Sequence, residues 1–207
     1  MQEHDFSLSL EINGVPADVP EEIELDENAP LEYPDVLDYD TRDKYVAAVK
    51  KVIPYLDADR LEAAATYYDR ERGLKQLDED LLQEVQKHYL LEEQIKESYT
   101  VAREQNGFDS QEMEAVVQLC KEDLSLADKV IEYYARRNQI LSTHVYFREY
   151  NPDYPTYKRL AIIYEKQKKY DAAIEVCKAA IEKSFPDDGS EGGMAGRIAR
   201  LQKKIRT

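Results

Sequence analysis

The chain has 207 residues, which is long enough to bury a hydrophobic core in one domain. Charged residues make up 34% of it and glycines number only 7, a composition that favours helices. No stretch approaches the length of a membrane span, and the first residues lack the basic, apolar and small-residue regions of a signal peptide. Its two cysteines have no CxxC partner and are interpreted as buried free thiols, so we expect a cytoplasmic location.

The net charge of −15 is concentrated at the N-terminus. Residues 1–40 hold 13 Asp or Glu and no Lys or Arg, whereas the rest of the chain holds 30 acidic and 28 basic residues. Residues 6–12 alternate apolar and polar side chains before Asn13-Gly14, which indicates a possible short β-hairpin. Proline and like charge otherwise predict an acidic, largely irregular arm over residues 1–40. Its densest carboxylates are Glu21, Glu22, Glu24, Asp26 and Glu27.

Three helices are predicted between residues 41 and 105. They begin at capping residues, in turn Thr41, Asp57 and Asp78, and they end at Pro54, Gly73 and Asn106-Gly107. His88 lies on the apolar stripe of the third helix. No second ligand stands at metal-binding spacing from it, so we expect a hydrogen-bonded core histidine.

The second half of the chain predicts two helical pairs and a final helix. Asp109 and Glu112 form a capping box for a helix that breaks near residues 123–125, and another helix follows over residues 126–141. An aromatic connector over residues 144–155 leads to two amphipathic segments within residues 157–181. A glycine-rich joint then precedes a last helix, 194–207, whose apolar face holds Met194, Ile198, Leu201 and Ile205.

The segment from Tyr157 to Ile181 resembles a tetratricopeptide repeat (TPR), a pair of antiparallel helices. The residues that match the repeat pattern are Tyr157, Leu160, Ala161, Tyr164, Tyr170, Ala173 and Ala180. Cys177 replaces the usual aromatic residue, and Pro186 arrives one residue late. At an offset of 46 residues, Ala115 and Ala127 align with Ala161 and Ala173, which indicates a degraded second repeat over residues 110–141.

This resemblance implies an all-α fold of about eight helices, in which antiparallel hairpins form a TPR-like right-handed α-solenoid. The helical domain would span residues 41–207, with residues 194–207 as its capping helix. In such a fold the first helix of each pair lines a groove that binds a peptide or partner helix. The corresponding residues here are Lys158, Ile162, Glu165 and Lys166 in the clear repeat, and Glu112, Val116, Leu119 and Cys120 in the degraded one. A carboxylate clamp is not predicted, because Ile162 stands where that clamp needs Asn.

No nucleophile elbow, P-loop or zinc-ligand pattern is present, so we predict no catalytic residue, metal or cofactor. The expected function is a non-catalytic protein–protein interaction or scaffold module with a protein or peptide partner. One alternative is that the acidic arm is a regulator or nucleic-acid mimic that binds a basic surface of a partner. An enzyme whose site is assembled from distant helices ranks last. The basic residues of the last helix are too few to predict nucleic-acid binding, and its lack of Trp or Phe anchors argues against membrane binding. Homo-oligomerisation stays open.

Overall fold

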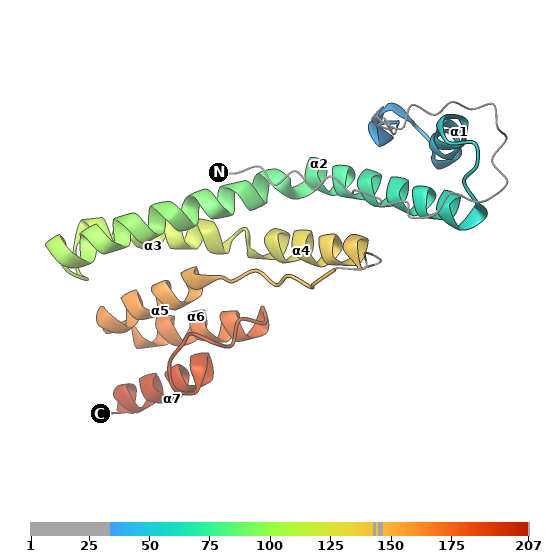
Figure 1. Cartoon of the computed structure of the whole chain (residues 1–207). Helices are drawn as coiled ribbons and strands as arrows, with labels where there is room; N and C mark the ends of the chain where they lie inside the picture. The colour runs from blue at the N-terminus through green and yellow to red at the C-terminus, as the bar shows by residue number, and fades with distance from the viewer. Residues whose placement is uncertain (1–33, 143, 145–146, 207) are drawn as a thin grey trace. The chain divides into compact units, whose positions relative to one another are not determined.

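The computed structural model describes residues 34–142, 144 and 147–206. These residues form helices and connecting segments without a β-strand, which confirms the all-α fold class for the part of the chain described (Figure 1). The possible hairpin at residues 6–12 and the carboxylates Glu21, Glu22, Glu24, Asp26 and Glu27 lie outside these residues. The chain divides into two compact units, residues 1–71 and residues 72–207.

The first unit packs a short 3-10 turn and one helix against the beginning of a long helix. These elements are η1 (Val36–Asp38), α1 (Arg42–Val52) and the start of α2 (Ala58–Val101). Thr41 caps α1 as predicted, since its Oγ1 accepts a hydrogen bond from the Lys44 amide. Val36 is buried with Tyr45, Val49 and Tyr68, and Tyr39 packs against them, so these two residues of the expected arm belong to a packed cluster.

The prediction that Gly73 ends a helix is wrong, as is the prediction that a new helix starts at Asp78. Asp57 does open a helix, with its Oδ1 accepting from the Arg60 amide at 2.8 Å, but this helix continues without interruption to Val101. A glycine inside a helix costs only about 1 kcal/mol relative to alanine. At Gly73 an added Cβ would stand 3.5 Å from Ile140 Cδ1, an ordinary contact distance.

The chain reverses direction at the end of α2, where the predicted Asn106-Gly107 stop is confirmed. A π-helical turn, η2 (Ala102–Asn106), ends at Gly107, which has a φ of 81° and donates its amide to the Ala102 carbonyl at 2.8 Å. The next helix, α3 (Gln111–Leu124), is not capped by an Asp109 and Glu112 pair. Ser110 is the N-cap instead, and its Oγ accepts from the Met113 amide at 3.1 Å.

The expected hairpin over residues 110–141 is not formed. The α4 helix (Ala127–Leu141) continues in the direction of α3, because Ser125 and Leu126, which join the two helices, keep right-handed helical angles. Both helices run back along α2 (Figure 1). Residues later in α2 therefore contact residues earlier in α4 and α3. The contact pairs in order along α2 are Gly73 with Ile140, Asp78 with Tyr133, Glu84 with Lys129, and His88 with Asp123.

The clear repeat forms the predicted helical hairpin, α5 (Pro155–Lys166) followed by α6 (Tyr170–Glu182). The α5 helix lies antiparallel to α3, since Thr156 contacts Asp123 and Gln167 contacts the Phe108 carbonyl. The last helix, α7 (Gly193–Arg206), packs along α6. Counting from the second unit's part of α2, the helices α2, α3, α5, α6 and α7 therefore alternate in direction.

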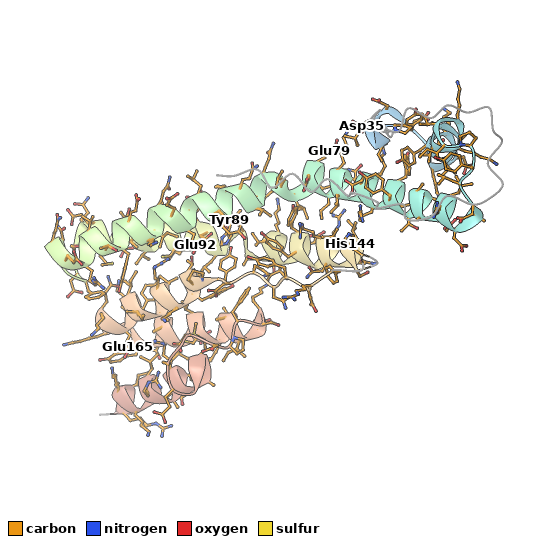
Figure 2. All side chains as sticks on the ribbon, viewed as in Figure 1. Asp35, Glu79, Tyr89, Glu92, His144 and Glu165 are labelled. Carbon is orange, nitrogen blue, oxygen red and sulfur yellow. The ribbon has the colours of Figure 1, made fainter. Side chains whose placement is uncertain are left out.

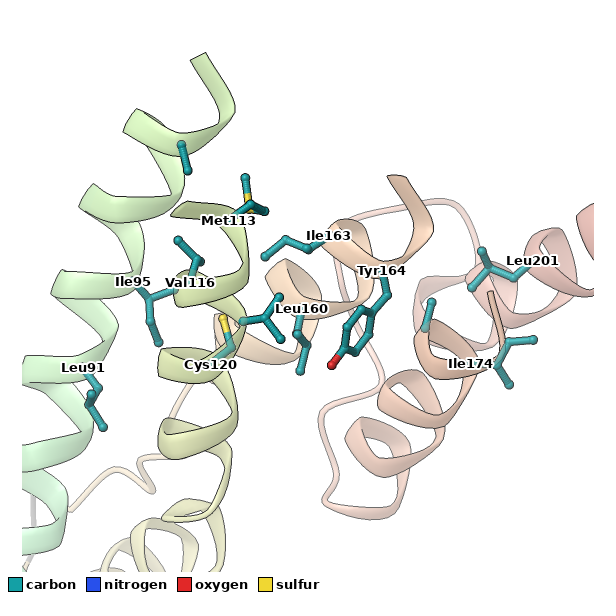
Figure 3. Packing of buried hydrophobic residues seen from close by; sticks show 13 residues of the cluster. Leu91, Ile95, Met113, Val116, Cys120, Leu160, Ile163, Tyr164, Ile174 and Leu201 are labelled. Carbon is teal, nitrogen blue, oxygen red and sulfur yellow. The ribbon is translucent and has the colours of Figure 1, made fainter. Parts of the chain in front are cut away.

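The core of the second unit is built from the facing apolar sides of these helices. Figure 3 shows side chains from α2 (Leu91, Ile95), α3 (Met113, Val116, Cys120) and α5 (Leu160, Ile163, Tyr164) meeting in one cluster, which continues to Ile174 and Leu201. The small residues expected at the helix crossing, Ala161, Ala173 and Ala180, are fully buried. Ile181 and Ile205, which the predicted stripes included, are exposed instead.

Candidate functional site: a cleft beside Lys158

A cleft of about 410 Å³ opens between the N-terminus of α5 and the loop that joins α6 to α7. Its apolar lining comes from both sides, with Tyr154 and Pro155 on one and Phe185, Pro186 and Met194 on the other. Its polar lining includes Asp153, Lys158 and Asp187. Lys158 extends from α5 toward the loop, because its Nζ would lie 3.5 Å from a Cβ placed on Gly189.

Lys158 is the only cation among the residues that line this cleft. Among the described residues it forms neither an ion pair nor a hydrogen bond, whereas the two loop carboxylates are occupied. Asp187 accepts from the Gly189 amide at 2.8 Å, and Asp188 pairs with Arg197 at 2.6 Å. An unpaired ammonium next to aromatic and proline side chains can bind an acceptor group of a peptide whose apolar residue enters the cleft.

The loop wall of the cleft is held by a buried ion pair. Asp188 is only 4% exposed and Arg197 only 8%, and Ser190 donates both its amide and its hydroxyl to Asp188. Burial alone would raise the pKa of Asp188, but the hydrogen bonds from Ser190 and Arg197 outweigh it and lower the pKa to about 2. The carboxylate is therefore ionised at neutral pH and fixes the loop to α7.

The four predicted groove residues of α5 lie on the outer side of that helix, but only Lys158 lines the cleft. Ile162 is partly buried and Lys166 is exposed. Glu165 is bonded to α7 through Arg197 at 2.8 Å and Lys204 at 2.7 Å (Figure 2). Burial opposes ionisation of Glu165, yet these cations lower its pKa. Glu165 thus connects the first helix of the repeat to α7.

The four predicted counterparts on α3 are not brought together at one surface. Glu112 is exposed and Leu119 partly buried, while Val116 and Cys120 are in the core cluster next to Leu160. The alignment at 46 residues treated α3 and α5 as equivalent helices. Their antiparallel packing makes them consecutive helices instead, so Val116 and Cys120 of α3 pack in the core with α5.

A buried polar network, which the sequence did not indicate, fixes the N-terminus of α5 below the cleft. His88 is fully buried, and its Nδ1 is hydrogen-bonded to Asp123 Oδ1 at 2.7 Å. Thr156 donates to the other Asp123 oxygen at 2.5 Å, and the Tyr154 hydroxyl donates to the Asp123 carbonyl at 2.9 Å. The imidazole also stacks on Tyr154, with ring centroids 4.3 Å apart. The prediction of a core histidine is confirmed, although Nε2 has no partner.

The described residues offer little reactive chemistry around this cleft. Burial raises the pKa of Cys120 to about 12 and that of Cys177 to about 11, so both thiols stay protonated at neutral pH. Within the described ranges, no group of three or more His, Cys, Asp or Glu side chains is placed to hold a metal ion. Residues 34–142 and 147–206 also include no helix long and apolar enough to cross a membrane.

Sequence reasoning missed the loop side of the cleft, because it treated residues 185–193 as a flexible joint. The one available signal was the apolar pair Phe185-Pro186 at the start of an otherwise polar, glycine-rich segment. No protein-family model, curated protein sequence or solved structure matches this chain.

Proposed function

We propose that this protein is a non-catalytic interaction module whose second unit binds a peptide of a partner protein in the cleft beside Lys158. The observation that carries this proposal is the cleft itself, which joins an apolar lining to Lys158, the only cation that lines it and one that forms no ion pair among the described residues. The ligand this chemistry favours is an extended segment with an apolar side chain next to a carboxylate.

The arrangement of α5, α6 and α7 supports a TPR-like interpretation of this unit. The hairpin buries the small residues of the repeat pattern, and α7 covers α6 as a terminal helix of a repeat array would. Of the predicted solenoid, this proposal keeps the series α2, α3, α5, α6 and α7, whose helices alternate in direction. In this series α5 and α7 would each be the first helix of a repeat pair. Lys158 and Glu165 then lie on the first helix of the clear repeat, with Glu165 joined to the next first helix.

A random peptide display library selected on the full-length protein tests this function. The expected result is enrichment of peptides that combine an apolar and an acidic residue, and loss of their binding in Lys158→Glu. Lys166→Glu is the matched control, since it makes the same charge change at an exposed position of the same helix outside the cleft. Failure to enrich any peptide, or equal binding to both variants, would contradict the proposal.

A further inference from the structure

A cluster of three tyrosines lies at the surface of the second unit, and none of the three lines the cleft. The tyrosine patch consists of Tyr89 from α2, Tyr134 from α4 and Tyr150 from the connector between α4 and α5. Tyr89 is 42% exposed and Tyr150 45% exposed. The hydroxyls of Tyr89 and Tyr134 are hydrogen-bonded at 2.6 Å, and the ring centroids of Tyr134 and Tyr150 are 4.7 Å apart.

The patch is held in place by main-chain contacts that do not use the rings. The side chain of Asn138 pairs with the backbone of Tyr150 in both directions: Nδ2 donates to the Tyr150 carbonyl at 2.8 Å and Oδ1 accepts from its amide at 3.1 Å. The connector is thereby fixed on α4. The half-exposed rings are therefore presented in one arrangement, which lowers the entropy that a ligand loses on binding.

Two carboxylates, Glu92 and Asp153, lie three residues along the chain from Tyr89 and Tyr150 and act on these tyrosines. Hydrogen bonding with Tyr89 and burial raise the pKa of Tyr150, and the negative charges of Asp153 and Glu92 act in the same direction. Burial and hydrogen bonding with Tyr134 likewise raise the pKa of Tyr89, with Glu92 again contributing. Glu92 lies on α2 one turn from Tyr89 (Figure 2).

Neither carboxylate is neutralised by the described residues. Glu92 is partly buried and has no hydrogen bond or ion pair among them. The side chain of Asp153 accepts only from the adjacent Tyr154 amide. Arg137 is a cation whose charge acts on Tyr134 and on the neighbouring Tyr133. A half-buried carboxylate beside aromatic faces is an incomplete cation site.

We propose that the tyrosine patch, with Glu92 and Asp153, binds an arginine side chain of a partner protein. A guanidinium group stacks on a tyrosine ring and donates in-plane hydrogen bonds to a carboxylate at the same time, which an ammonium group does less well. The chain makes this kind of contact internally, with Arg70 4.9 Å above the Tyr67 ring and Arg103 5.7 Å above the Tyr99 ring. The negative charges of Glu92 and Asp153 disfavour the binding of acidic segments at this surface. The inference goes beyond the proposed function, because it concerns the opposite ligand charge and three tyrosines that do not line the cleft; Asp153 borders both.

The probe is a fluorescein-labelled peptide of alternating Arg and Gly, titrated with full-length protein and followed by fluorescence anisotropy. Its control peptide carries citrulline in place of arginine, which keeps the shape and removes the charge. Because the whole chain is acidic, the decisive comparison is between variants of equal net charge. Glu92→Gln is expected to weaken binding about two- to fivefold, the effect of an exposed cation–π or ion contact. Glu93→Gln, at an exposed neighbouring position of the same helix, is expected to change binding little.

A second variant removes a ring without disturbing the fold. Tyr150→Ala keeps the backbone pair with Asn138, and its melting curve is compared with that of the wild type. The expected result is weaker binding of the arginine peptide and loss of its NMR shifts at the Tyr89 and Tyr134 amides. The proposal is overturned if the citrulline peptide binds as tightly, if Glu92→Gln and Glu93→Gln weaken binding equally, or if no binding is detected. These variants and peptides differ from those that test the cleft, so either idea can fail without the other.

Discussion

The ion pair between Asp188 and Arg197 makes a quantitative prediction about the pH dependence of stability. In the folded chain the pKa of Asp188 is about 2, against an ordinary value of 3.8. One pH unit of difference corresponds to about 1.4 kcal/mol, so the ionised carboxylate stabilises the folded chain by about 2 kcal/mol at neutral pH. Because the folded pKa is the lower one, this contribution is complete above pH 4 and is lost as the pH falls toward 2.

The perturbation is Asp188→Asn, which keeps the shape of the side chain and removes the charge. It leaves the buried Arg197 with Glu165 as its remaining partner, and we expect a loss of about 2–3 kcal/mol at pH 7. Urea unfolding followed by far-UV circular dichroism, repeated from pH 7 to pH 3, gives the free energy of unfolding of both proteins. The difference in free energy of unfolding between the two proteins should narrow by more than 1 kcal/mol over that range. The other carboxylates titrate in both proteins, so their effect cancels in this difference.

The matched control is Asp187→Asn, the exposed neighbour in the same loop, whose contact with the Gly189 amide an asparagine can also make. Its unfolding curve should follow that of the wild type at every pH. A gap for Asp188→Asn that stays constant from pH 7 to pH 3 would refute the assignment of the stabilisation to the ionised carboxylate. So would a gap below about 0.5 kcal/mol at pH 7, the range of ordinary surface substitutions.

Two further substitutions test the helix path and the buried network. Gly73→Ala should stabilise the protein by about 0.5–1 kcal/mol, because the residue is helical and an added Cβ meets Ile140 at an ordinary contact distance. The measurement is the urea midpoint, which should rise. A lower midpoint would show that the helix does not continue through this position. Thr156→Val should cost about 1–3 kcal/mol of unfolding free energy, because it leaves a fully buried Asp123 oxygen without its donor. Thr156→Ser keeps the hydroxyl and should keep most of the stability. Equal losses in the two variants would point to packing rather than the hydrogen bond.

The local structure of the clear repeat could be predicted because period and residue size agree there. Ala161, Ala173, Cys177 and Ala180 recur at helical spacing, and all are fully buried where α5 meets its neighbours. The continuity of α2 could not be predicted by the same reasoning, because the cost of a helical glycine is small compared with the packing of a 44-residue helix. The missing reversal after α3 did have a signal, since residues 123–126 contain neither Gly nor Pro.

The candidate site was predictable only on one side. Lys158 was assigned to a binding surface from its place in the repeat pattern, and it does line the cleft. The opposite wall comes from residues 184–189, and their approach depends on the buried pair of Asp188 and Arg197, which no local pattern indicates. The tyrosine patch is similar, since its three rings come from segments joined only by the antiparallel packing of α4 on α2.

The alternating directions of α2, α3, α5, α6 and α7 have a consequence for how the second unit opens. Many of its helix contacts join consecutive members of this series, as α6 with α7, α5 with α6 and α3 with α5. Stability in such a series is shared between neighbours and is not uniform along the chain. Among the described helices α7 has neighbours only on the side of α5 and α6, so its amides should exchange with solvent before those of α3 and α5. The loop wall of the cleft, which depends on Arg197, would then open and close with α7, while the tyrosine patch would keep its arrangement.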